Sequence, residues 1–423
     1  MNYVLLIIFT ALACWWIAKP AFIKSSGLSP VIIRSLFVIK VLAGFALGWI
    51  SVHLYGSKPA DNDYWMINEE GWKEYQLLIH HPKEYLSNLF VSPYSNDSGF
   101  FGSIQSYWND LKNNLVIKLV SLFNIYSRGD YYVNSLFMNC IGFFGHVALY
   151  RVFISIYKEK QAAVIVGCFL LPSCLYFSSG LHKDAIVFTA LGLFSLSIYQ
   201  CVSEKITSPR KILVLLFSSI VLLLIRSYVL VLAVPAAIAY FLSERKKWNS
   251  ILAFIVVYLI ATGLFFSINK FVPSINPPAI VVQKQHDFAT GVSMSTKTVT
   301  QTALPVGVLE PTTMSFAKNS APALEHSFLR PYLTDRQSKF MMPLSIELLF
   351  YQLLIVISIF FSLRSPKHIR PFILFGALLT ISIYLNLGFI VDNIGSIVRY
   401  RSLYLPFLVT PALCSVYRRR NTI

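Results

Sequence analysis

The sequence predicts an all-α fold, a polytopic transmembrane helix bundle of about eleven spans. Two observations carry this prediction. The chain has 423 residues that are 56% hydrophobic and only 13% charged, with a mean hydropathy of +0.61, whereas soluble domains are about a quarter charged. So much apolar surface excludes a soluble enzyme, a disordered chain and a fibrous repeat. The apolar residues also fall in runs, many of them close to the length of about 20 residues that crosses a bilayer as a helix.

Eleven apolar runs are expected to form the spans, in a single membrane domain over 1–423. The runs that flank Arg226 are among the shorter ones, so we expect them to be tilted or packed inside the bundle. The approximate limits of the runs are 3–18, 31–55, 131–153, 161–178, 184–202, 211–225, 228–243, 249–268, 343–363, 371–390 and 402–417.

Basic residues gather in the short connections between the runs, and with eleven spans all six clusters fall on one face. By the positive-inside rule this face is cytoplasmic, which places the N-terminus outside and the C-terminus inside. We therefore expect a multi-pass protein of the cytoplasmic (inner) membrane. The excess of 36 Lys and Arg over 19 Asp and Glu then reflects topology rather than a nucleic-acid partner. The clusters are Lys19, Lys24 and Arg34; Arg151, Lys158 and Lys160; Lys205, Arg210 and Lys211; Arg245, Lys246 and Lys247; Arg364, Lys367 and Arg370; and Arg418, Arg419 and Arg420.

Two long segments, 56–130 and 268–342, are expected on the opposite, extracytoplasmic face. Loops of this length are uncommon unless they are functional. The first segment carries aromatic and aliphatic residues at helical spacing, which predicts helices that lie in the membrane interface. The second is rich in Ser, Thr, Pro and Ala up to about Ala323, so we expect it to be flexible there and to serve as a lid.

Two carboxylates, Asp61 and Asp63, stand between the second run and the first interfacial helix. In a structural role, one of them would cap the N-terminus of that helix. In a functional role, one would act as general base for an acceptor hydroxyl at the water-facing mouth of a membrane cavity. Asp63 is preferred because it adjoins the helix, but the sequence alone leaves the choice open.

A second polar group lies where a span breaks after Pro172 and the next begins at Asp184. The turn between them contains His182 and Lys183. Ionisable groups between two hydrophobic helices are costly and usually functional. The alternative is that Asp184 caps the following helix while Lys183 extends toward the interface.

Arginines also occur at the outer ends of spans, where the positive-inside rule disfavours them. We predict that Arg226, Arg330, Arg399 and Arg401, together with Lys183, bind the phosphate of a lipid, because arginine binds phosphate oxygens through two hydrogen bonds and stays charged. The competing interpretation is a set of structural ion pairs with acidic residues. Those candidate partners are Asp184, Glu325, Glu347 and Asp392. The supporting residues of the predicted site are His182, Asp184, Glu325, His326 and Tyr400.

The order of these motifs resembles the GT-C superfamily, in the branch similar to protein O-mannosyltransferases and bacterial lipid A aminoarabinose transferases. The matching features are an acidic residue before juxtamembrane helices, a span that ends in Pro172 ahead of Asp184, a basic residue midway at Arg226, and a late Arg399-Tyr400 followed by Pro406. The acidic residue of the family follows the first span, whereas here it follows the second. This departure leaves the choice between Asp61 and Asp63 open.

The resemblance implies a membrane glycosyltransferase that moves a sugar from a polyprenyl-phosphate donor to a glycan, lipid or protein acceptor at the extracytoplasmic face. It implies no obligatory cofactor, and no metal ligands are predicted. An oligosaccharide repeat-unit polymerase or O-antigen ligase, which uses a lipid-diphosphate donor, is the alternative. A flippase or transporter needs a polar path through the bundle, and few polar residues lie inside the runs. These residues are Lys40, Asn139, His146, Gln352 and Asn386.

Overall fold

The computed structural model describes residues 3–54, 62–92, 106–295, 303–335, 341–364 and 370–417. Within these ranges the chain is helical, and the extended pairing is limited to one isolated antiparallel bridge between Ala303 and Asn393. The predicted all-α membrane fold is therefore confirmed. The helices, in order, are α1 (Tyr3–Trp16), α2 (Ala21–Lys24), α3 (Pro30–His53), α4 (Asp63–His80), α5 (Pro82–Ser87), η2 (Asn88–Phe90), α6 (Tyr107–Ser127), α7 (Tyr131–Ile156), α8 (Gln161–Phe169), α9 (Pro172–Phe177), α10 (Lys183–Val202), α11 (Pro209–Arg245), α12 (Ser250–Phe271), α13 (Pro277–Ser295), α14 (Thr313–Leu324), η4 (Glu325–Leu329), α15 (Met341–Arg364), α16 (Pro371–Ile390), α17 (Ile394–Ser402) and α18 (Leu405–Val416).

Seven of the described helices are long and apolar enough to cross a membrane, namely α3, α7, α10, α11, α12, α15 and α16. This number is smaller than the eleven spans expected, for three reasons. The two runs around Arg226 form two helical arms that are counted together as α11 and meet at a kink at Arg226. The run 161–178 is divided into α8 and α9, because Pro172 has no N–H with which to continue a helix. The first and last runs form apolar helices of only 14 and 12 residues, α1 and α18.

Helix α11 is sharply bent at Arg226, whose φ of −142° and ψ of 74° are not helical. Arg226 lies beside Asp184 at the start of α10. The far arm of α11 returns to the end of α10, where the Tyr240 and Ser203 hydroxyls lie 2.6 Å apart and Arg245 donates to the Cys201 carbonyl at 2.8 Å. Both arms therefore run alongside α10, as expected for two short spans that meet at Arg226.

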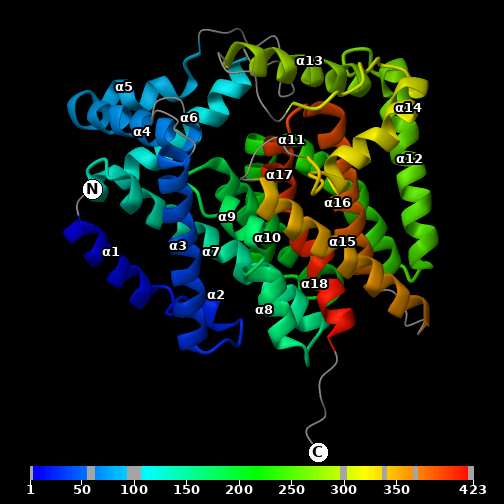
Figure 1. The fold of residues 1–423 in the computed structure, drawn as a ribbon, viewed down its shortest axis with the longest axis horizontal. Helices are drawn as coiled ribbons and strands as arrows, with labels where there is room; N and C mark the ends of the chain where they lie inside the picture. Colours follow the sequence, from blue (N-terminus) through cyan, green and yellow to red (C-terminus); the bar gives the residue numbers. More distant parts are fainter. Residues whose placement is uncertain are drawn as a thin grey trace, which may run out of the picture.

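The bundle has two distinct ends (Figure 1). Helices α4, α5, α6 and α13 lie at one end, and the C-terminal end of α18 lies at the other. At the C-terminal end, basic side chains cap helix carbonyls, since Arg370 donates to Ile156 and Lys160 donates to Cys414. Cations are favourable beside the carbonyl ends of helices. Arg370 and Lys160, which the sequence assigned to one face of the membrane, thus both lie at this end of the bundle.

The first long segment forms α4, α5, η2 and α6, as its helical spacing predicts. Trp65 fixes the start of α4 to the spans, because its indole donates to the Gly48 carbonyl at 3.1 Å and its ring stacks on Tyr131 with centroids 4.1 Å apart. Asn68 adds a hydrogen bond of 3.0 Å to the Gly129 carbonyl. Asp63, the first residue of α4, is thereby held against the bundle.

The second long segment, which its composition predicts to be flexible, contains regular structure in its described part. Its described part contains the helices α13 and α14. Gln285 of α13 donates to the Phe389 carbonyl at 2.6 Å and accepts from the Leu309 N–H at 2.9 Å. The Leu304 N–H donates to the Asp392 carbonyl at 2.7 Å. The segment is thus bonded to the turn that precedes α17, and Thr312 caps α14 by accepting from the Ser315 N–H at 3.3 Å.

Candidate functional site

The site is built around Asp184, a carboxylate that is completely buried in the first turn of α10. The chain reaches this position because Pro172 ends the preceding helical run, after which α9 and a short turn lead to His182. His182 is the N-cap residue of α10, and its imidazole lies 3.3 Å from the Asp184 N–H. The cap is therefore His182, which leaves the Asp184 carboxylate free for other partners.

Two arginines from distant helices share this carboxylate. Arg226, at the bend of α11, contacts Asp184 Oδ1 through Nη2. Arg399, from α17, donates through Nε to Asp184 Oδ2 at 2.7 Å. The guanidinium of Arg226 also lies 4.5 Å from the ring centre of Tyr400. The bend in α11 is what brings Arg226 to the level of Asp184.

Arg399 connects this buried pair to Asp63. Its Nη1 donates to Asp63 Oδ2 at 3.1 Å, and its Nη2 lies 2.7 Å from His182 Nε2. The Tyr64 ring lies 5.0 Å from the Arg399 guanidinium carbon. Arg399 therefore has a buried carboxylate on one side and the Asp63 carboxylate, with 59% of its side chain exposed, on the other.

Asp63 does not cap its helix. Asn62 is the N-cap residue of α4, and its side chain accepts from the Tyr64 N–H at 3.1 Å. The structural interpretation of Asp63 as a cap is therefore wrong. Asp61, the other candidate base, lies outside the described residues.

The electrostatics of the cluster favour charged carboxylates and a neutral histidine. Burial raises the pKa of the Asp63 carboxyl, but the surrounding groups, Arg399 first among them, together outweigh this effect, and the pKa lies below its usual value. Burial and the nearby Arg399 lower the pKa of His182 to about 4. Because His182 Nδ1 accepts from the Asp184 N–H, a neutral His182 carries its proton on Nε2, and Arg399 Nη2 lies 2.8 Å from the accepting Nδ1. Two arginines and two aspartates then balance in charge.

Two lysines near the cluster are not balanced in this way. Lys183 and Lys112 have no hydrogen bond or ion pair to any part of the chain that the structure describes. Burial, with the positive charges of Lys284, Lys183 and Arg226, lowers the pKa of Lys112 to about 8. A group of cations that raise each other's energy is a favourable place for an anion.

The remaining predicted site residues lie in other contacts. Arg330 pairs with Glu325 at 3.1 Å and with Asp335 at 3.7 Å. Arg401 donates to the Ser327 carbonyl at 3.0 Å and to the carbonyl of Arg330. Arg399 and Arg401 are two residues apart on α17 and thus point to different faces of the helix. His326 is buried beside Glu325 in η4.

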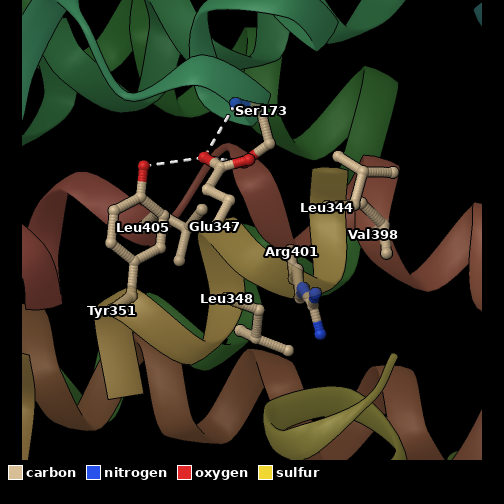
Figure 2. Close-up of a pocket in the computed structure, with 8 residues that line it drawn as sticks. All are labelled: Ser173, Leu344, Glu347, Leu348, Tyr351, Val398, Arg401 and Leu405. Carbon is tan, nitrogen blue, oxygen red and sulfur yellow. Dashed lines mark hydrogen bonds between the residues drawn. The ribbon is translucent and has the colours of Figure 1, made fainter. Parts of the chain in front are cut away.

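Arg401 lines a small cavity of about 10 Å³, room for roughly one water molecule (Figure 2). Glu347 Oε1 accepts there from the Ser173 N–H at 2.9 Å and from the Tyr351 hydroxyl at 2.7 Å. Figure 2 shows the Arg401 guanidinium turned away from the Glu347 carboxylate. The ion-pair interpretation therefore holds for Arg226 and Arg399 with Asp184 and for Arg330 with Glu325, whereas Glu347 is held by Ser173 and Tyr351.

The sequence interpretation overlooked Tyr64 and Lys112. Tyr64 directly follows Asp63, so its position beside the site could have been inferred from its neighbour. Lys112 lies in the first long segment, which the sequence predicts on the outer face, where the positive-inside rule disfavours a cation, and this signal was available as well. Within the described residues, no three His, Cys, Asp or Glu side chains are grouped so that they could hold a metal ion.

A family model described as a predicted membrane protein (DUF2142) matches residues 111–306. The matched region includes Asp184 and Arg226, whereas Asp63 and Arg399 lie outside it. Neither the curated proteins nor the solved structures gave a match. These comparisons support a membrane protein.

Proposed function

We propose that this protein is a membrane glycosyltransferase that moves a sugar from a polyprenyl-phosphate-linked donor to an acceptor hydroxyl, at the extracytoplasmic face of the cytoplasmic membrane. One observation carries the proposal. An exposed carboxylate, Asp63, lies 3.1 Å from a guanidinium, Arg399, that is itself anchored on a buried carboxylate, Asp184. Such a site offers a base and a fixed cation side by side, and both are needed to transfer a group from phosphate to a hydroxyl.

The pairing of Asp63 with Arg399 suggests how the donor activates the site. While the two are paired, the pKa of Asp63 is lowered, so the carboxylate is a weak base. A donor phosphate that binds Arg399 Nη1 would take the place of Asp63 there. Without its cation Asp63 would become a stronger base, because the charge that stabilised its ionised form is now shared with phosphate. The base would then be active when the donor is bound.

The proposed reaction is a displacement at the anomeric carbon of the sugar. The bond between that carbon and the phosphate oxygen breaks, and its electron pair remains on the phosphate. The acceptor oxygen forms the new bond to carbon, and its proton passes to Asp63. Negative charge grows on the phosphate as the bond breaks, so the fixed charge of Arg399 stabilises the transition state more than the ground state.

The test is transfer by the purified protein from synthetic polyprenyl-phosphate sugars. Asp63→Asn should lower the turnover about 10²–10⁴-fold, as is typical when a general base is lost. Arg399→Lys keeps the charge but loses the fork of donors, and should weaken transfer as well. The matched control is Glu69→Gln, because Glu69 lies on the same helix and pairs with the exposed Lys73. Wild-type rates in Asp63→Asn would reject Asp63 as the base, and the same result in Asp61→Asn would leave neither aspartate in that role.

A second candidate is an oligosaccharide repeat-unit polymerase or ligase that uses a lipid diphosphate. The specific observation in its favour is the presence of Lys112 and Lys183 beside Arg226, because a diphosphate carries more negative charge than a monophosphate. The same assay with a polyprenyl-diphosphate donor separates the two candidates. Lys112→Met should then lower transfer from the diphosphate donor and leave transfer from the monophosphate donor unchanged.

A further inference from the structure

Three polar side chains inside the bundle converge on the break before Asp184. They are Lys40 of α3 and Asn139 and His146 of α7, and all three are fully buried. The transfer chemistry proposed above uses none of them. Ionisable residues within membrane-spanning helices are rare and usually functional, so their position needs an explanation.

His146 replaces a backbone donor that Pro172 lacks. In an uninterrupted helix the N–H of residue 172 would bond to the carbonyl of Cys168, but proline has no N–H. The structure satisfies this carbonyl with His146 Nδ1, at 2.6 Å. Because Nδ1 donates there, Nε2 is the unprotonated nitrogen and can accept, and Lys40 Nζ lies 3.2 Å from it.

Lys40 has the same role further along the chain. A continuous helix would bond the Ser178 carbonyl to the N–H of His182, but that N–H donates to the Gly180 carbonyl at 2.8 Å. Lys40 Nζ donates instead to the Ser178 carbonyl at 2.9 Å. It also lies 3.1 Å from each of the Ser178 and Ser179 hydroxyls. Asn139 completes the set with a hydrogen bond of 2.9 Å to the Ser179 carbonyl.

This arrangement explains how the bundle tolerates a lysine. A carbonyl without a donor is strongly unfavourable in hydrocarbon, and a broken helix is tolerated there only when neighbours satisfy its backbone. Lys40 forms no ion pair with a carboxylate in the described part of the chain. Its ammonium group lies within hydrogen-bond distance of the Ser178 carbonyl, the Ser178 and Ser179 hydroxyls and His146. Lys40 therefore satisfies backbone and hydroxyl groups of the turn and does not neutralise a carboxylate.

The held turn has little freedom to move. A Cβ atom at Gly142 would lie 2.9 Å from Lys40 Cε, and one at Gly180 would lie 2.8 Å from the Tyr64 ring. Both values are well below an ordinary contact distance, so the turn packs tightly against the ring that follows Asp63, and the Lys40 chain packs tightly against Gly142 of α7. Only four residues separate Ser179 from Asp184, and a shift of the turn would therefore carry His182 and Asp184 with it.

We propose that Lys40 is a positioning residue for the site. It fixes the Ser178–Ser179 turn, with the help of Asn139 and His146, at the depth at which Asp184 receives Arg226 and Arg399. The inference rests on the proposed function only for the transfer assay described below. The hydrogen–deuterium exchange measurement tests it independently of that function.

The first test is hydrogen–deuterium exchange on the purified full-length protein in lipid nanodiscs. Lys40→Met keeps the length and apolar bulk of the side chain but removes its donors, and should speed the exchange of amides 178–184 about tenfold or more. Lys40→Gln keeps an amide donor and should restore some of the protection. The control is Lys160→Met, which removes a lysine that bonds the Cys414 carbonyl at the other end of the bundle, and should leave amides 178–184 unchanged.

A folded Lys40→Met protein with unchanged exchange in 178–184 would overturn the proposal. A uniform increase over α3, α7 and α10 would overturn it too, because it would indicate general loosening. If Lys40→Met does not fold, Lys40→Gln and Ser179→Ala decide instead, since each removes only some of the network, and both must show the same local increase.

The second test uses the transfer assay. A displaced Asp184 should lower kcat about tenfold or more while the KM for the donor stays within about twofold, because the donor still meets the cations but the transition state is poorly aligned. Lys40→Gln should recover some of the lost kcat. If the wild-type protein transfers no sugar, the proposed function fails, and the exchange measurement still decides the role of Lys40.

Discussion

At the scale of single residues, the most consequential contact is the sharing of Asp184 by two arginines. Arg226 and Arg399 lie 42 and 215 residues from it in the chain. Breaking a buried ion pair typically costs about 3–5 kcal/mol because a charge is left without a partner. With two cations on one buried carboxylate, substitution of Asp184 itself is expected to abolish folding rather than to report on chemistry. The exposed member, Asp63, is the informative position.

The neutral state of His182 gives a prediction about pH. Burial, together with Arg399, lowers its pKa to about 4, whereas an unfolded chain has a histidine pKa of about 6.5. Between these values the unfolded state binds the extra proton. The stabilisation is therefore complete above about pH 6.5 and is lost as the pH falls toward 4, at up to about tenfold in the folded-to-unfolded ratio per pH unit.

Thermal unfolding of the purified protein over this range measures the effect. His182→Asn keeps a residue that favours an N-cap but does not titrate, so the variant should show a flatter profile below about pH 6.5. The same change at the exposed His81 should leave the wild-type profile in place. A His182→Asn profile as steep as that of the wild type would show that other groups cause the acid sensitivity.

At the scale of elements, the contact between α7 and α10 positions the site, because it joins the helix that carries His146 to the helix that begins beside Asp184. The two helices approach at Gly145 and Gly192. A Cβ atom at Gly145 would lie 2.7 Å from the Thr189 Cα. Small residues at such a crossing let the backbones of membrane helices pack closely.

Widening this crossing should therefore destabilise the protein. Gly145→Val introduces bulk where no space exists, and overpacking of this kind typically costs about 1–3 kcal/mol. Gly263→Val is the matched control, since a Cβ atom at Gly263 of α12 meets nothing within 4 Å. Melting temperatures of the two variants in the same detergent provide the comparison. Equal melting temperatures would contradict the close-packing argument.

The sequence could predict most helices but not how they bend. Hydropathy locates the runs, and the charge of Arg226 indicates an interruption between two of them. The sequence did not reveal that the two runs are joined directly by a kink at Arg226, without a connecting loop, because this depends on Asp184 standing opposite to receive the side chain. The composition of the Ser- and Pro-rich second segment did not indicate its helices for a related reason, since Gln285 holds α13 through hydrogen bonds that composition cannot reveal.

The candidate site was predicted in part. Asp63, His182, Asp184, Arg226 and Arg399 were selected because charged groups at the outer ends of spans need partners, and the structure brings them together. Arg401 was selected by the same rule, yet it donates hydrogen bonds to the carbonyls of Ser327 and Arg330 and lies outside the cluster around Asp184. The rule for charged groups at span ends predicts how deep in the membrane an arginine lies. It does not predict which face of α17 carries the arginine, because that depends on the rotation of the helix.

At the scale of the whole molecule, the topology gives a prediction that does not depend on chemistry. We expect Glu69 on α4 and Glu159 between α7 and α8 to face opposite sides of the membrane, because the basic clusters assign the second to the cytoplasm. Both positions are exposed. Single cysteines placed there in a cysteine-free protein should differ in reaction with a membrane-impermeant maleimide on intact cells. Equal labelling of both would reject the arrangement of spans.

The large separations in chain position within the site have a consequence for how the protein is made. The pair between Arg226 and Asp184 closes a loop of 42 residues and can form as soon as the hairpin of α10 and α11 has left the ribosome. Arg399 lies 336 residues after Asp63 and emerges near the end of synthesis. Until then Asp63 lacks the arginine with which it forms an ion pair. Assembly of the site is therefore a late event, and a nascent chain halted before α17 would hold a complete Arg226–Asp184 hairpin next to an open, uncompensated carboxylate.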